Sequence, residues 1–66
     1  MAGRKNYAVN TNGRGLNVRK HPSQTAPVLR VLKDGEKIAV DTSKESPAGW
    51  KALLGEEGYV MAAFLK

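Results

Sequence analysis

The apolar positions of the chain fall in short runs that glycine and proline separate. These two residue types interrupt the sequence at Gly13, Gly15, Pro22, Pro27, Gly35, Pro47, Gly49, Gly55 and Gly58. The runs between them are too short for ordinary helices, but they have the length and spacing of strands in a β-sandwich or β-barrel. The pattern therefore predicts an all-β protein.

Six strands are expected from these runs. They cover residues 7–9, 16–19, 28–32, 37–41, 49–54 and 59–61, with polar loops at 20–27 and 42–48. Alternation of apolar and polar residues predicts that Leu16 and Val18 point inward from one strand, and Ile38 and Val40 from another. The run 28–32 does not alternate strictly, so the pattern leaves its inward side chains open.

Turn signals connect these strands. Asp34-Gly35 is a strong hairpin signal between two strand-like runs, and residues 55–58 carry two glycines that can adopt positive φ. After the last strand, residues 61–65 are expected to form a single helical turn that brings Phe64 or Leu65 into the core. Phe64 is assigned to the core.

The length of 66 residues bounds the fold to one small domain, in which only about 60% of the unfolded surface can be buried. A helix over residues 51–54, continued over 61–66, is the alternative, but two glycines interrupt it. Six short strands in so few residues predict a closed or half-closed barrel of about five to seven strands, which removes exposed edges. We expect residues 1–6 to be a flexible segment and residues 7–66 to form the barrel.

Charge is distributed unevenly along the chain. Residues 1–33 carry seven basic and no acidic side chains (+7), residues 34–66 carry four basic and six acidic (−2), and the sum is the formal net charge of +5. This excess favours anionic partners such as wall polymers, nucleic acid or lipid headgroups without choosing among them.

The sequence shows no membrane or export signal. No run approaches the about 20 apolar residues of a membrane span, and the basic residues 4–5 are not followed by the apolar segment of a signal peptide. We therefore expect a chain that stays in the cytosol, is exported by another route, or is a piece of a longer exported protein.

Catalytic and metal-binding patterns are missing from the sequence. The chain has no cysteine and one histidine, His21, which excludes disulfides, cysteine-ligated zinc and paired-histidine metal sites. Glu56 and Glu57 are adjacent in an expected turn, which favours a solubilising turn over the two flanking acids of a hydrolase. Gly13-Arg14-Gly15 precedes a strand instead of a phosphate-binding helix. We expect no catalytic residue, no metal and no cofactor.

Aromatic rings and one polar strand face are the candidates for binding. Trp50 and Tyr59 each follow a glycine at the start of an expected strand, so a hairpin of these strands would place both rings on one face, where they would offer stiff, flat surfaces to a sugar or peptide. The alternative is that Trp50 is the largest core residue. Asn17 and Arg19 point outward together and suit a carboxylate or phosphate, or they form a solvated strand face.

At residues 16–19 the sequence L-N-V-R resembles the start of a bacterial SH3 domain (SH3b, SH3_3 type). Further matches follow in order at Pro22-Ser23, Val28-Leu29, Leu32 with Gly35, Ile38 with Val40, Gly49-Trp50, Gly58-Tyr59-Val60 and Leu65. The resemblance covers nearly the whole chain from Tyr7 to Leu65. Two features depart from it: His21 stands where the family most often has glycine, and the hairpin over residues 53–58 is short and acidic.

The resemblance implies a non-catalytic binding module with an SH3-like barrel. Such domains are typically appended to peptidoglycan hydrolases, including phage endolysins, and hold them on the bacterial wall. The implied partner is therefore peptidoglycan or an associated anionic polymer, and the implied location is the cell wall or extracellular space, within an exported or phage-delivered protein. The expected ligand-binding residues are Tyr7, Asn17, Arg19, His21, Trp50 and Tyr59.

Two other functions stay open. A protein-interaction or oligomerisation module agrees with the missing signal peptide. A nucleic-acid-binding barrel agrees with the basic charge, but the acidic C-terminal half opposes a wrapped polyanion, so nucleic acid is the least favoured partner.

Overall fold

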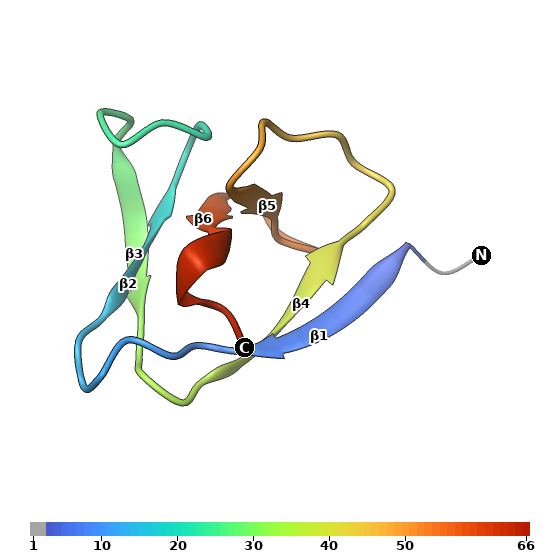
Figure 1. Ribbon diagram of the computed structural model, residues 1–66. Helices are drawn as coiled ribbons and strands as arrows, with labels where there is room; N and C mark the ends of the chain where they lie inside the picture. Colours follow the sequence, from blue (N-terminus) through green and yellow to red (C-terminus); the bar gives the residue numbers. More distant parts are fainter. Residues whose placement is uncertain (1–2) are drawn as a thin grey trace.

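Six short β-strands form two antiparallel sheets in the computed structural model, which describes residues 3–66 (Figure 1). The elements are β1 (Arg4–Ala8), β2 (Leu16–Arg19), β3 (Val28–Leu32), β4 (Lys37–Asp41), β5 (Trp50–Ala52), β6 (Tyr59–Met61) and the 3₁₀ turn η1 (Ala62–Phe64). The prediction of an all-β fold is confirmed, and the helical alternative is wrong. Within residues 3–66 no helix is long and apolar enough to cross a membrane.

The two sheets join into a small barrel. One sheet holds β1 and β4, and the other has the order β3-β2-β6-β5. Isolated bridges between Val40 and Leu53 and between Val9 and Leu65 connect the sheets. Figure 1 shows the β1–β4 pair on one side, the β2–β3 pair on the other, and β5, β6 and the C-terminal turn between them. The fold is therefore the SH3-like barrel that the sequence predicts.

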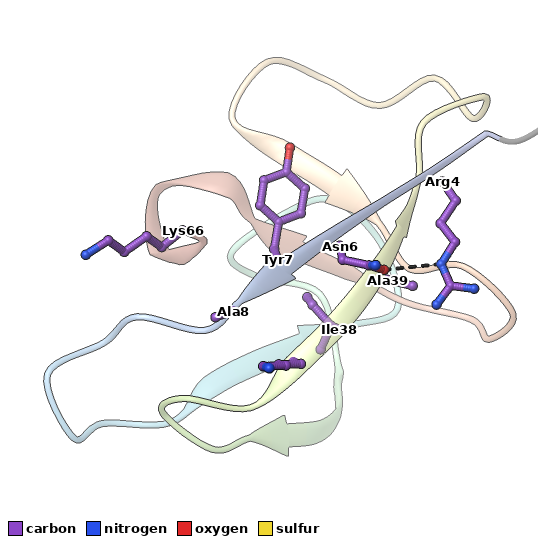
Figure 2. A pocket seen from close by; sticks show the side chains of 8 residues that line it. Arg4, Asn6, Tyr7, Ala8, Ile38, Ala39 and Lys66 are labelled. Atoms are coloured by element: carbon purple, nitrogen blue, oxygen red, sulfur yellow. Dashed lines mark hydrogen bonds between the residues drawn. The ribbon is translucent and has the colours of Figure 1, made fainter.

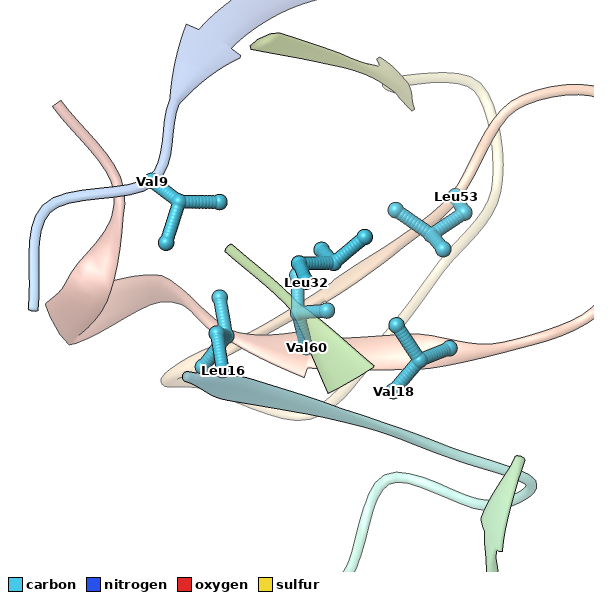
Figure 3. Packing of buried hydrophobic residues seen from close by; sticks show 6 residues of the cluster. All are labelled: Val9, Leu16, Val18, Leu32, Leu53 and Val60. Atoms are coloured by element: carbon cyan, nitrogen blue, oxygen red, sulfur yellow. The ribbon is translucent and has the colours of Figure 1, made fainter. Parts of the chain in front are cut away.

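In the part of the chain that the structure describes, aliphatic side chains alone fill the core (Figure 3). Its cluster consists of Val9, Leu16, Val18, Leu32, Leu53 and Val60, each at most 5% exposed. The inward positions predicted for Leu16, Val18 and Val40 are confirmed, and Ile38 packs partly buried against the cluster. Each fully buried valine or leucine stabilises the fold by about 1.5–3 kcal/mol. Among residues 3–66 no aromatic side chain is buried, so the rings stay on the surface.

The assignment of Phe64 to the core is wrong. Its side chain is 39% exposed, whereas Leu65 is half-buried against the core. The bridge between Val9 and Leu65 orients this segment. Leu65 is extended and its side chain packs on the core, which leaves Phe64, the last residue of η1, exposed.

The Asp34-Gly35 turn forms, but the hairpin expected from it is wrong. Strands β3 and β4 belong to different sheets. The backbone of Val9 pairs with the turn: Gly35 N–H donates to the Val9 carbonyl (2.7 Å) and Val9 N–H donates to the Glu36 carbonyl (2.9 Å). These contacts direct β4 away from β3 and toward β1.

The carboxylate of Asp34 holds a neighbouring loop. It accepts hydrogen bonds from the backbone N–H groups of Thr11 (2.8 Å) and Gly13 (2.7 Å). These bonds, that of Thr11 first, lower the pKa of Asp34 because they stabilise the ionised form. The side chain therefore stabilises the fold above the ordinary carboxyl pKa of about 4, and this contribution is lost as the pH falls through the lowered value.

Replacing Asp34 with asparagine is expected to make the fold less sensitive to acid. An asparagine side chain has one acceptor oxygen and an NH₂ group that would oppose a backbone donor, so the melting temperature should fall at pH 7. Between pH 5 and pH 2 the melting temperature of the variant should decline less steeply than that of the wild type. Glu57→Gln, which also removes one exposed carboxylate, is the control and should keep the wild-type slope; equal slopes for wild type and Asp34→Asn would contradict the prediction.

The first strand begins earlier than the sequence indicates. The expected strand covers residues 7–9, whereas β1 starts at Arg4 and pairs with β4 from Arg4–Asp41 to Ala8–Lys37. Residues 4–6 are polar and exposed, so no apolar alternation marks them; pairing with β4 makes them a strand. Of the segment 1–6 expected to be flexible, residues 1–2 lie outside the described residues. Strand β5 is also shorter than the expected 49–54.

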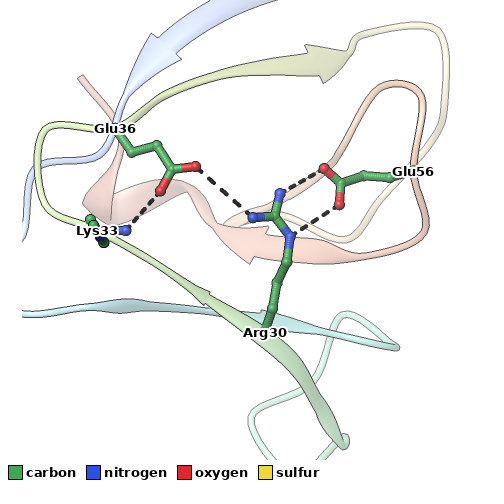
Figure 4. A network of polar contacts seen from close by, with 4 residues as sticks. All are labelled: Arg30, Lys33, Glu36 and Glu56. Carbon is green, nitrogen blue, oxygen red and sulfur yellow. Dashed lines mark hydrogen bonds and ion pairs between the residues drawn. The ribbon is translucent and has the colours of Figure 1, made fainter.

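An ion pair joins β3 to the turn before β6 (Figure 4). Arg30 of β3 donates to both carboxylate oxygens of Glu56 (3.1 and 2.7 Å), and Glu36 lies 3.9 Å from the same guanidinium. The expected turn at residues 55–58 is confirmed, but Glu56 does more than solubilise it, since it connects the turn to β3. Both partners are close to half exposed, so the pair contributes at most about 1 kcal/mol. The aliphatic core dominates stability.

Candidate ligand-binding surface

Pairing of β5 with β6 brings two aromatic side chains to one face. Trp50 lies opposite Met61, and Tyr59 lies opposite Ala52. Directly opposite residues project from the same side of a sheet, and diagonal neighbours about 7–8 Å apart remain within reach of large side chains. Both rings are half-buried, and Val60 between Tyr59 and Met61 points into the core. Trp50 is therefore not a core residue.

Two loops reach this face. Gln24, in the loop over residues 20–27, donates from Nε2 to the Met61 sulfur at 3.9 Å. In the loop over residues 42–49, the Lys44 ammonium lies 5.0 Å from the centre of the Tyr59 ring. We call Trp50, Tyr59 and Met61, with Gln24 and Lys44 at the rim, the aromatic face. It combines flat rings with one amide and one cation, groups that can stack on a ligand, form hydrogen bonds with it and attract a negative charge.

Strand β2 extends the same side of the sheet. Arg19 lies opposite Tyr59, and Asn17, two residues earlier, is exposed. The outward direction predicted for both residues is confirmed. The guanidinium of Arg19 has a structural contact, since its Nη1 donates to the Ala26 carbonyl at 2.8 Å. Arg19 thus holds the loop over residues 20–27 in place beside the aromatic face.

His21 lies in a loop that borders this face, whereas Tyr7 lies in the other sheet. His21 is exposed in the loop over residues 20–27, where its carbonyl accepts a hydrogen bond from Ser23 N–H (2.8 Å). Tyr7 is half-buried on β1, in the other sheet, and the Lys5 ammonium is 5.4 Å from its ring centre. The structure therefore brings Asn17, Arg19, Trp50 and Tyr59 to one sheet face but not Tyr7.

Tyr7 lines a separate hollow of about 490 Å³ over β1 and β4 (Figure 2). Three cationic residues, Arg4, Lys37 and Lys66, contribute to its lining. Arg4 Nε also donates to Asn6 Oδ1 at 3.2 Å. The hollow has a basic character, whereas the aromatic face has two rings.

Sequence reasoning missed three residues of the aromatic face: Gln24, Lys44 and Met61. Met61 is recognisable only when the register of β5 and β6 is known, because it lies opposite Trp50. Gln24 and Lys44 are loop residues, and no sequence pattern indicates which way a loop folds. Within residues 3–66 no cluster of three histidine, aspartate or glutamate side chains forms a candidate metal site.

Comparison with protein families gives one match. The family model described as "Bacterial SH3 domain" matches residues 14–66. The matched range contains every residue of the aromatic face, while β1 with Tyr7 precedes it. Comparisons with curated proteins and with solved structures gave no match.

Proposed function

The chain belongs to the bacterial SH3 domain family, whose members are non-catalytic binding modules often found in cell-wall hydrolases, and on this premise we propose that it binds the bacterial cell wall. The ligand is peptidoglycan or an associated anionic polymer. The observation that carries the proposal is the placement of Trp50 and Tyr59, both half-buried, on one outer sheet face. An aliphatic core supports this face from behind.

The aromatic face suits a polymer of sugars and peptides. Aromatic rings offer large contact area at low entropic cost, because they have few rotatable bonds. Lys44 and Gln24 add a cation and an amide for carboxylate, hydroxyl or peptide groups. The net charge of +5 attracts an anionic wall over longer distances. In a cell, the module would hold an attached hydrolase or endolysin on the wall, within an exported or phage-delivered protein.

Co-sedimentation with purified Gram-positive cell walls tests the proposal. The domain is expected to pellet with the walls at physiological salt and to stay in the supernatant without them. Walls stripped of covalently attached protein by protease are the required second sample. Absence of the domain from the pellet in both samples would contradict the proposal.

A protein-interaction function is the second candidate, and one observation favours it. Strand β3 is an edge of the larger sheet, and three of its apolar side chains are 45–56% exposed: Val28, Leu29 and Val31. Such an edge is a template for pairing with another chain. Binding to untreated walls that disappears after protease treatment would favour this candidate over a wall polymer.

A further inference from the structure

A second hollow, of about 600 Å³, lies beside Phe64 and is used neither by the core nor by the aromatic face. Its lining consists of Asn10, Thr11, Asn12, Arg14, Gly15, Ala63 and Phe64. The Phe64 ring is 39% exposed although an aliphatic core is available nearby. The volume falls in the range of small-molecule sites.

The loop that forms one wall of this hollow is fixed from several sides. Asp34 binds the backbone N–H groups of Thr11 and Gly13, and Arg14 N–H donates to the Thr11 carbonyl at 3.2 Å. Asn12 holds a φ of 57°, which asparagine adopts more readily than most residues. A loop that is already ordered loses little conformational entropy when a ligand binds.

The same loop is tied to the backbone of the η1 turn that carries Phe64. Asn10 N–H donates to the Phe64 carbonyl at 2.8 Å, so the amide-bearing loop and the η1 turn keep one relative position. Asn10, Asn12 and Arg14 are exposed and line the hollow. Phe64, the two asparagines and Arg14 thus line one hollow.

These groups match the chemistry of an amino sugar. A side-chain amide both donates and accepts hydrogen bonds, which suits sugar hydroxyls and an acetamido group. An aromatic ring covers the apolar C–H face of a pyranose. The guanidinium of Arg14 suits a carboxylate. Of the described residues, no aspartate or glutamate lines the hollow, and the nearby carboxylate of Asp34 is bound to the backbone N–H groups of Thr11 and Gly13.

We propose that the hollow between the 10–15 loop and Phe64 binds a saccharide unit that carries acetamido and carboxylate groups, as a site separate from the aromatic face. The choice of this ligand rests on the proposed wall-binding function, because the glycan strand of peptidoglycan carries both groups. Asn10 and Asn12 precede the range that the family model matches, so part of this site is built from residues outside it.

Nuclear magnetic resonance titration with soluble saccharides tests the site. One probe is chitotetraose, which has acetamido groups only, and the other is the disaccharide of N-acetylglucosamine and N-acetylmuramic acid, which adds a carboxylate. Both are expected to shift the amide signals of Asn10, Asn12 and Phe64. The carboxylate-bearing probe should bind about 10-fold more tightly per sugar unit, and Arg14→Ala should remove this difference.

Two variants test the binding site without changing the stability of the fold. Asn12→Gly removes the amide while glycine accepts the positive φ freely, and Phe64→Leu keeps an apolar side chain without the ring. Each is expected to weaken binding about 5- to 10-fold with unchanged melting temperature. Leu54→Ala, which trims another exposed apolar side chain, is the control and should bind like the wild type. If Asn12→Gly and Phe64→Leu bind the saccharide as tightly as the control Leu54→Ala and the wild type, the proposal is overturned.

The remaining outcomes separate this site from the proposed function. Wall binding with no saccharide-induced shifts at the hollow would overturn the site and leave the function standing. Saccharide binding at the hollow without co-sedimentation would support the site and contradict wall binding by the intact domain. Shifts at the same residues with a single-stranded oligonucleotide, and none with the saccharides, would assign the hollow to nucleic acid and overturn the proposal.

Discussion

Replacing Trp50 with alanine is expected to weaken binding to purified cell walls by about 30-fold or more. Trp50 is half-buried on the outer face beside Met61 and diagonal to Tyr59, so its ring is available to a ligand. Central aromatic residues of an interface cost about 2 kcal/mol or more when truncated, and 2 kcal/mol corresponds to about 30-fold in affinity. Co-sedimentation at increasing wall concentration measures the effect.

Two further variants define what this loss means. Trp50→Phe keeps a ring and should retain most of the binding, which separates loss of an aromatic surface from general disturbance of β5. Tyr7→Ala removes an aromatic ring from the other sheet and should bind like the wild type. Unchanged binding of Trp50→Ala, together with lost binding of Tyr7→Ala, would move the wall site to the β1–β4 hollow.

Replacing Gly58 with alanine is expected to destabilise the fold by about 3 kcal/mol or more. Gly58 is buried at a φ of 142°, a conformation that side chains rarely adopt. A β-carbon there would overlap the Cγ1 atom of Val18, and Val18 is fully buried and has no space to move into. Backbone strain and overpacking each cost about 1–3 kcal/mol. Since a domain of this size is only marginally stable, most of the variant should be unfolded at 37 °C.

Gly55 offers a matched control in the same turn. It also has a positive φ, of 82°, but a β-carbon at this position would meet no atom of another segment within 4 Å. Gly55→Ala should therefore cost only about 1–2 kcal/mol, the penalty of the left-handed conformation. Urea unfolding of both variants gives the comparison. An equal loss for the two would show that the contact with Val18 does not matter.

The sequence predicted the local features of the fold well. Alternation at residues 16–19 identified both the strand and its inward side chains, because a side-chain period of two is a property of any strand. Glycine at positions 55 and 58 marked a turn that needs positive φ, and both residues have it. The outward direction of Asn17 and Arg19 followed from the same alternation.

Several features of the fold and of the candidate site could not be predicted from the sequence. Phe64 and Leu65 are adjacent and apolar, and only the bridge from Leu65 to Val9 decides which one meets the core. The partner of β4 is set by the contacts of the Asp34-Gly35 turn with Val9, which lies far earlier in the chain. A sequence-local hairpin signal carries no information about such a distant pairing.

The chain by itself determines that it forms short strands, that aliphatic residues supply the core, and that a positive charge excess lies in its first half. These properties follow from residue type and from spacing over a few positions. Only the tertiary structure decides that Trp50 and Tyr59 share a face with Met61, that Arg19 supports a loop, and that Phe64 borders a hollow. Each of these depends on strand register and on hydrogen bonds between distant segments, which are fixed only when the barrel closes.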